Sequence, residues 1–111
     1  QLGHDIKLKF LEEAGLTIVS DKAMGLGGSD IYCSTPPEFW FKNVMAMRND
    51  EADAYFISCA NIHSIDVIHD LEKELRKPVI TSNQAALWRA LRLAGVEDSI
   101  PALGCLFETA I

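Results

Sequence analysis

Segments with helical spacing of apolar residues alternate along this chain with short, almost wholly apolar runs, and this alternation limits the possible folds. The predicted helices comprise residues 1–14, 35–49, 64–76 and 83–94. The predicted strands comprise residues 16–20, 52–59, 78–82 and 102–107. Because helices and strands alternate, we expect the strands to run parallel, with helices packed on both faces of the sheet.

The fold class that follows is α/β, a three-layer α/β/α arrangement with a parallel sheet of about four strands. The run at 52–59 is nearly continuous in apolar character, which is typical of a strand covered on both faces. A chain of 111 residues fits one domain with a hydrophobic core of its own. With 49% hydrophobic and 23% charged residues, its composition is that of a globular protein and not of a disordered one.

Residues at the ends of the predicted helices fit known capping patterns. Gly15 and Gly95 stand where left-handed residues close the first and last helices. Thr35 can cap the helix at its start, with Pro36 in the first helical position and Glu38 completing a capping box.

Charge and hydropathy exclude two classes of partner. The net charge is −6 and the 10 Lys and Arg residues are scattered, whereas a surface for nucleic acid needs clustered basic residues. No apolar run approaches the roughly 20 residues that span a bilayer, so we expect no membrane partner. Residues 1–10 lack the apolar core of a signal peptide. Gln1 in place of Met is expected of a processed product, of an engineered product or of a fragment of a longer protein.

Cysteine usage predicts a reducing compartment. Cys33, Cys59 and Cys105 form no CxxC pair, and the histidines offer no zinc-finger spacing. A disulfide framework is therefore not expected, and the pattern predicts a cytoplasmic protein. Cys33 and Cys105 are predicted simply to pack. His63 and His69 are six residues apart and do not share a helical face well, so we do not expect them to form a metal site.

Cys59 is the candidate for chemistry that the residues alone favour most. It ends the run at 52–59 and precedes a helix, within the segment SCANIHS at 58–64. In open α/β sheets, ligands bind beyond the carboxyl ends of the strands. Unpaired N–H groups at a helix start attract a carboxylate and lower the pKa of a thiol. A thiolate there could abstract a proton or attack an alkene carbon; position alone leaves a buried, inert cysteine equally open.

A second polar strand end is KPVITSNQ, at 77–84. If this strand neighbours the one at 52–59, its polar end lies near Cys59. Asn83 and Gln84 could then donate hydrogen bonds to a substrate carboxylate. The motif by itself favours a simpler interpretation, in which Ser82 or Asn83 only caps the following helix.

The loop predicted at 21–34 contains Gly25, Gly27 and Gly28. Their spacing differs from G-x-G-x-x-G, and several residues separate them from the next predicted helix, so a dinucleotide site is not favoured. We interpret this segment as a flexible loop or lid.

The stretch from Ala52 to Val96 resembles the maleate isomerase and arylmalonate decarboxylase group of the aspartate/glutamate racemase superfamily. ISCANI is similar to the strand-end SCTNL of that group, and KPVITSNQAALW is similar to its KPVLSSNQATLW. LKFLEEAGLTIV also looks like the opening of the family's second domain. The resemblance covers nearly the whole chain and is specific for the maleate cis–trans isomerase branch, but less so for the substrate.

The resemblance implies that residues 1–111 are the C-terminal, second racemase-like domain of a two-domain isomerase, with one catalytic cysteine in each domain. It implies chemistry without a metal, pyridoxal phosphate or nicotinamide, so no cofactor is expected. By motif position, Cys59 is the catalytic thiol. The implied substrate-binding residues are Ser58, Ala60, Asn61 and Asn83. In maleate isomerases, one cysteine is thought to add to the double bond, which allows rotation before elimination.

Two departures from the family pattern qualify this prediction. Ala60 stands where Thr is usual, so a hydroxyl donor is lost. Neither Cys33 nor Cys105 matches the first-domain cysteine, so we expect that domain to be absent from this chain and the isolated chain to be inactive. Residues 83–111 are then expected to pack toward the first domain or a partner chain, and a homo-oligomer is expected.

The leading prediction is therefore a maleate isomerase acting on a small dicarboxylate. An amino-acid or hydantoin racemase and an arylmalonate decarboxylase are the alternatives. From another class, a non-catalytic small-acid-binding α/β domain would keep the anion site without an activated Cys59. A Cys59 pKa well below the usual value of about 8.5 favours the enzyme, and an inert thiol favours the binding domain.

Overall fold

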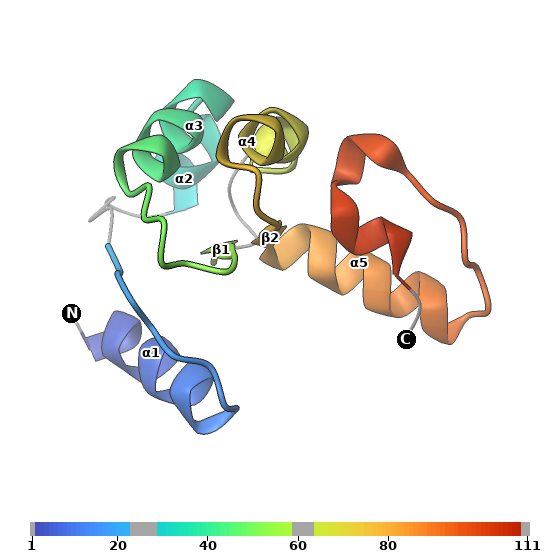
Figure 1. Cartoon of the computed structure of the whole chain (residues 1–111). Coiled ribbons are helices and arrows are strands. Elements are labelled where there is room, and N and C mark those ends of the chain that lie inside the picture. The colour runs from blue at the N-terminus through green and yellow to red at the C-terminus, as the bar shows by residue number, and fades with distance from the viewer. Residues whose placement is uncertain (1, 23–28, 59–63, 110–111) are drawn as a thin grey trace.

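The computed structural model describes residues 2–22, 29–58 and 64–109 of the chain (Figure 1). The α-helices are α1 (Leu2–Glu13), α2 (Ser29–Ser34), α3 (Pro37–Ala46), α4 (Ile68–Leu75) and α5 (Ser82–Leu93). The strands are β1 (Tyr55–Ile57) and β2 (Val79–Thr81), and the 3-10 helices are η1 (Ile65–Val67), η2 (Pro101–Leu103) and η3 (Cys105–Glu108). The predicted helices are all confirmed: the first three are shorter than predicted, and α5 begins and ends one residue before the predicted range of 83–94.

The two strands run parallel, as predicted, and α4 connects them. The register pairs Tyr55 with Val79, Phe56 with Ile80, and Ile57 with Thr81. The α/β class is therefore confirmed. The expected sheet of about four strands is wrong for the described residues, which form a two-stranded sheet.

The predicted strand at 16–20 is wrong, since this segment has no strand structure in the described chain. Leu16 is 57% exposed and Val19 is 46% exposed. β-branched residues favour an extended backbone, but a strand forms only where a neighbouring edge takes up its N–H and C=O groups. No described strand pairs with this segment.

The predicted strand at 102–107 is also wrong, because η2 and η3 occupy this region. Its backbone groups bond locally: the N–H of Leu103 donates to Ile100 and the N–H of Phe107 donates to Gly104. Gly104 has φ 83°, a left-handed conformation that breaks an extended run. A short apolar run with Gly and Pro at its borders is therefore folded here as tight turns of 3-10 helix.

The hydrophobic core lies on one side of the sheet, where α3 and α4 lie (Figure 1). Its buried members are Trp40, Ile57, Val67, Leu71, Leu75 and Val79. Ile68 of α4 is also fully buried, so the apolar stripe predicted for 64–76 is confirmed. On the opposite face of the sheet, Phe56 is 49% exposed. The predicted three-layer arrangement has a second helix layer on this face, but none of the described helices covers Phe56.

Replacing Leu71 with alanine is expected to lower the free energy of unfolding by about 3 kcal/mol, because truncating a fully buried side chain leaves a cavity. Leu87→Ala is a matched control, since Leu87 is 42% exposed and should lose less than about 1 kcal/mol. Urea denaturation of both variants measures the difference. Equal losses would contradict the placement of Leu71 in the core.

The two predicted glycine caps are confirmed, whereas the predicted N-cap of α3 is wrong. Gly15 and Gly95 have φ 98° and 83°, as predicted for left-handed caps. The N-cap of α3 is Pro36, which offers no side-chain hydrogen bond. Thr35 does not cap α3; its hydroxyl donates to the carbonyl oxygen of Ile31 at 2.6 Å. This happens because 29–34 is helical, so Thr35 lies just past the end of α2.

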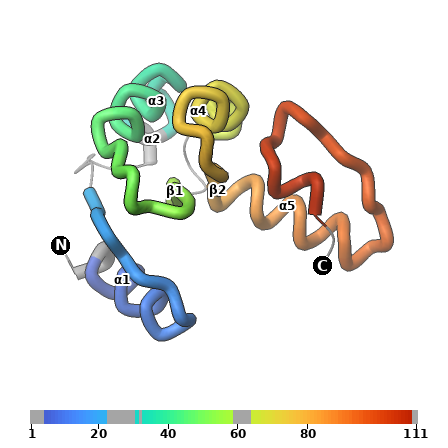
Figure 2. The backbone as a smooth tube through the Cα atoms, in the orientation of Figure 1, coloured from blue at the N-terminus to red at the C-terminus, as the bar shows by residue number. Residues whose placement is uncertain are grey.

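The C-terminal segment folds back along α5, as the backbone trace shows (Figure 2). Arg92, 8% exposed, holds it there. The guanidinium donates at 2.9–3.2 Å to the main-chain carbonyl oxygens of Val96, Asp98, Phe107 and Thr109. The guanidinium carbon also lies 5.6 Å from the centre of the Phe107 ring. The side chain of one helical residue thus binds four separate carbonyl groups of the following segment.

Candidate functional site

The carboxyl ends of β1 and β2 lie at the same edge of the sheet. Because Ile57 pairs with Thr81, Ser58 and Ser82 follow the strands at equivalent positions. Ser58 is exposed, and Asn83 is half-buried in the first turn of α5. The structure therefore brings together the two polar strand ends that the sequence marked as a site, which is the edge where α/β proteins bind ligands.

Part of the predicted site lies outside the described residues. This applies to Cys59, Ala60 and Asn61, and also to the glycine loop at 25–28. Their roles stay predictions. Of the predicted site residues, Ser58 and Asn83 are those that the structure places.

Gln84, considered as a donor to substrate, is used inside the protein. It is fully buried. Its side-chain oxygen accepts from the N–H of Thr81 at 2.9 Å, and its amide nitrogen donates to the carbonyl oxygen of Leu103. The hydroxyl of Thr81 accepts from the N–H of Gln84 at 3.1 Å, which completes a capping box. Thr81, and neither Ser82 nor Asn83, therefore caps α5. The T-x-x-Q spacing at 81–84 was the sequence signal that identifies this cap.

Ser64 is a buried polar residue that the sequence patterns did not indicate. It is fully buried at the start of η1, and its hydroxyl has no hydrogen-bond partner among the described residues. An unsatisfied buried hydroxyl costs about 1–3 kcal/mol. Such groups in folded proteins require an explanation, and a functional site is one of the recognised ones.

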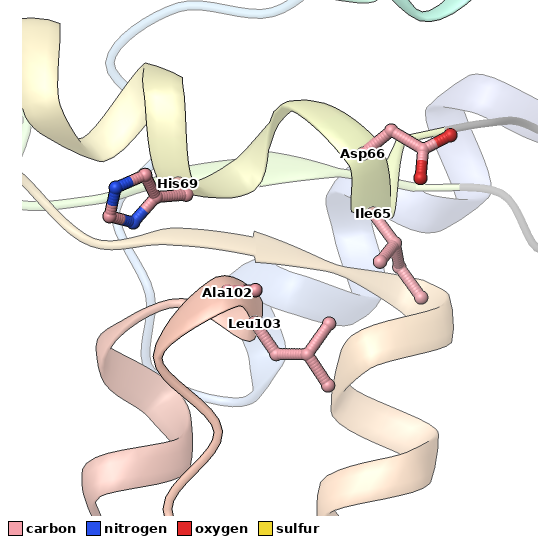
Figure 3. A pocket seen from close by; sticks show the side chains of 5 residues that line it. All are labelled: Ile65, Asp66, His69, Ala102 and Leu103. Atoms are coloured by element: carbon pink, nitrogen blue, oxygen red, sulfur yellow. The ribbon is translucent and has the colours of Figure 1, made fainter.

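A cavity of about 400 Å³ lies between η1, α4 and η2 (Figure 3). It is lined by Ile65, Asp66, His69, Ala102 and Leu103. The side chains of Ile65 and Leu103 converge from η1 and η2, and Asp66 points away from them. Because most of this lining is apolar, the cavity suits an apolar group better than a carboxylate.

Cys105 is a protonated structural thiol, in agreement with the prediction that it packs. Its sulfur lies 3.3 Å from a carboxylate oxygen of Glu72, whose other oxygen accepts from the N–H of Cys105 at 2.9 Å. Burial, followed by the hydrogen bond and the charge of Glu72, raises the pKa of the Cys105 thiol to about 11. Glu72 also accepts from the N–H of Val79 at 2.9 Å, so it connects α4 to β2 and η3.

Cys33 differs from its prediction, because it is exposed in α2 and does not pack in the core.

Maleimide labelling at pH 8 should modify Cys105 about a hundredfold more slowly than a cysteine with the ordinary pKa of 9.0, because the thiolate is the reactive form. The raised pKa keeps this thiol protonated, so its labelling should accelerate as the pH rises toward 11. Mass spectrometry of time points gives the rate at Cys105, and a short unfolded peptide with one cysteine is the reference. A Cys105 rate equal to that of the peptide at pH 8 would contradict the contact with Glu72.

The described part of the chain contains no cluster of His, Cys, Asp and Glu residues that could hold a metal ion. Nor does any helix in it have the length and apolar character needed to cross a membrane.

Two comparisons with known proteins bear on this site. The sequence profile of the arylmalonate decarboxylase family matches residues 4–107. The arylmalonate decarboxylase of Bordetella bronchiseptica is 36% identical over 59 residues, a stretch that covers 52% of this chain and 25% of that protein. The match thus spans a quarter of the length of this curated relative.

Proposed function

Because this chain belongs to the arylmalonate decarboxylase family, we propose that Cys59 serves a cofactor-independent decarboxylation of a substituted malonate. This differs from the maleate isomerase that led the sequence analysis, and it is the alternative that the family match favours. The observation that carries the proposal is the pairing of Ile57 with Thr81. It brings the segment that leads into Cys59 next to the segment that leads into Asn83.

The proposed reaction needs only proton transfer and stabilisation of charge. The bond between C2 of the malonate and one carboxylate carbon breaks, and CO2 leaves. The electron pair stays on C2 and is delocalised into the remaining carboxylate as an enediolate. The Cys59 thiol donates its proton to C2, and the resulting thiolate regains a proton from water. Atoms and electrons balance without an oxidant or a reductant.

The remaining carboxylate needs hydrogen-bond donors that are in place before charge develops on it. We assign this role to the side chains of Ser58, Asn61 and Asn83 and to the backbone N–H of Ala60. The exposure of Ser58 and the partial burial of Asn83 at one edge support the assignment. The helical segment 65–75 begins just after this region, and the start of a helix carries partial positive charge. This local field favours an anion although the net charge of the chain is −6.

The proposal includes a first racemase-like α/β domain that completes the site. Leu87, Leu93 and Val96 are 42%, 67% and 37% exposed along and just after α5. An apolar surface of this kind in residues 83–111 is suited to packing on that domain or on a partner chain. The substrate would then bind between the domains, with Cys59 on one side.

The test uses the protein encoded by the whole reading frame that contains this chain. It is incubated in D2O with an aryl-substituted malonate, and CO2 release is followed together with deuterium at C2 of the product. The expected result is one CO2 and one deuterium per turnover. CO2 release without deuterium at C2, or no turnover of any malonate tested, would overturn the proposal.

A maleate isomerase is the second candidate, because ISCANI and KPVITSNQAALW resemble the motifs of that branch. In it, the Cys59 sulfur adds to one alkene carbon, the remaining C–C bond rotates, and elimination of the sulfur gives fumarate. The same preparation distinguishes the two reactions, since maleate would yield fumarate with no CO2. A protein that is inert toward both substrates and has an unreactive Cys59 would instead be a small-acid-binding domain.

A further inference from the structure

The hydroxyl of Ser64 is a buried hydrogen-bonding group that has no partner among the described residues. Its side chain is fully buried, so bulk water does not take the place of a partner. An unpaired buried hydroxyl costs folding free energy, whereas an alanine of nearly the same size would carry no such cost. Because buried hydroxyls are paired in the large majority of cases, a partner is expected outside the described residues.

The helical segment that follows Ser64 does not use this hydroxyl. Ser64 is the N-cap of η1, but its side chain makes no capping hydrogen bond. Its main-chain carbonyl oxygen accepts from the N–H of Val67 at 3.2 Å instead. The equally buried hydroxyl of Thr81, in contrast, caps α5 by accepting from the N–H of Gln84. The hydroxyl of Ser64 is therefore available for a bond in the other direction along the chain.

A serine hydroxyl can reach the main-chain carbonyl groups three or four residues before it. For Ser64, these carbonyl groups belong to Asn61 and Ala60. Both residues lie between Ser64 and Cys59, in the segment to which the proposed function assigns the reacting thiol. On its other side, Ser64 is joined to the core, because Val67 is a buried core residue and α3 packs on η1. A bond from Ser64 back along the chain would thus connect the thiol segment to the packed core.

We propose that Ser64 is a positioning residue for Cys59. Its hydroxyl donates to a main-chain carbonyl oxygen of Ala60 or Asn61, and this bond holds the thiol at the start of the helical segment 65–75. The inference rests on the proposed function for the role of Cys59, but not for the choice of substrate. Because the side chain of Ser64 is fully buried, it acts through the chain segment and does not touch the reacting atoms.

The first measurement follows the thiol itself and needs no substrate. In the protein encoded by the whole reading frame, Cys59 is alkylated with iodoacetamide at pH 7, and mass spectrometry of the peptide that contains it gives the rate. Ser64→Ala should lower this rate at least about threefold, because a thiol that leaves a helix start loses the partial charge that stabilises its thiolate. Ser64→Thr keeps the hydroxyl and should keep the rate within about twofold.

The second measurement is turnover of the aryl-substituted malonate by the same variants. Ser64→Ala should lower kcat at least about tenfold and change KM much less, because misplacing a reacting group by about 1 Å costs up to about a hundredfold. A protein that turns over no malonate would contradict the proposed function, while the alkylation rates would still decide the role of Ser64.

Two control variants separate the hydrogen bond from a general loss of stability. Thr35→Ala removes a hydroxyl whose partner is the carbonyl oxygen of Ile31. Trp40→Phe removes the other buried polar atom that lacks a partner in the described part of the chain, and it does so in the helix that packs on η1. Both should keep the alkylation rate and kcat. An unchanged rate in Ser64→Ala, or an equal loss in Ser64→Thr or Trp40→Phe, would overturn the proposal.

Discussion

Replacing Cys59 with serine should lower the rate of CO2 release from an aryl-substituted malonate by at least about a hundredfold. The proposed step is proton donation from sulfur to C2, and a positioned acid of suitable pKa contributes about 10² to 10⁴ in rate. A serine hydroxyl is a far weaker acid than a thiol and is nearly isosteric with it. The substitution therefore removes the proton donor and leaves the binding groups in place, so KM should change much less than kcat.

The other cysteines provide matched controls for this measurement in the whole reading-frame product. Cys33 is exposed in α2, and Cys105 is bound to Glu72. Cys33→Ser should keep the full rate. Cys105→Ser should keep kcat even if it lowers the unfolding temperature. A Cys59→Ser variant with unchanged kcat would remove Cys59 from the mechanism.

Gly104→Ala should lower the free energy of unfolding by about 3 kcal/mol, the largest loss we expect from a single added methyl group. A Cβ atom at Gly104 would lie 2.6 Å from Cγ2 of Ile68 and 3.0 Å from both carboxylate oxygens of Glu72. Ile68 is fully buried and cannot move aside. The substitution therefore disrupts the core and the carboxylate that connects α4, β2 and η3. Urea denaturation monitored by tryptophan fluorescence measures the loss.

Gly95→Ala separates this steric clash from backbone strain. Gly95 has the same φ as Gly104, 83°, but within the described residues a Cβ atom there would meet nothing within 4 Å beyond its chain neighbours. It should therefore lose only about 1 kcal/mol, the cost of a left-handed alanine. Similar losses in the two variants would show that the clash at Gly104 is relieved by local movement.

The sequence predicts best those elements whose signal is local and repeated. The spacing of Ile68, Leu71 and Leu75 defines a buried stripe without reference to the rest of the chain. The parallel direction of β1 and β2 follows from the helix between them. The segments 16–20 and 102–107 were assigned wrongly because a short apolar run does not reveal whether a neighbouring strand edge is available to it.

Prediction of the candidate site from the sequence was limited by contacts between residues that are far apart in the chain. The strand-end position of Ser58 and Asn83 followed from the pattern of strands and helices, and the register of the sheet is consistent with it. The burial of Gln84 depends on Leu103, which is 19 residues away in the chain. The hydrogen bonds of Arg92 likewise depend on how residues 96–109 return to α5. Contacts of this kind have no periodic signature in a sequence.

The bonds of Arg92 have a consequence for how this region tolerates mutation. Its partners are main-chain carbonyl oxygens, which every residue carries whatever its side chain. Substitutions of Val96, Asp98 or Thr109 should therefore leave these hydrogen bonds in place. A lysine at position 92, in contrast, has three donors on a single nitrogen and could not satisfy four separate carbonyl groups.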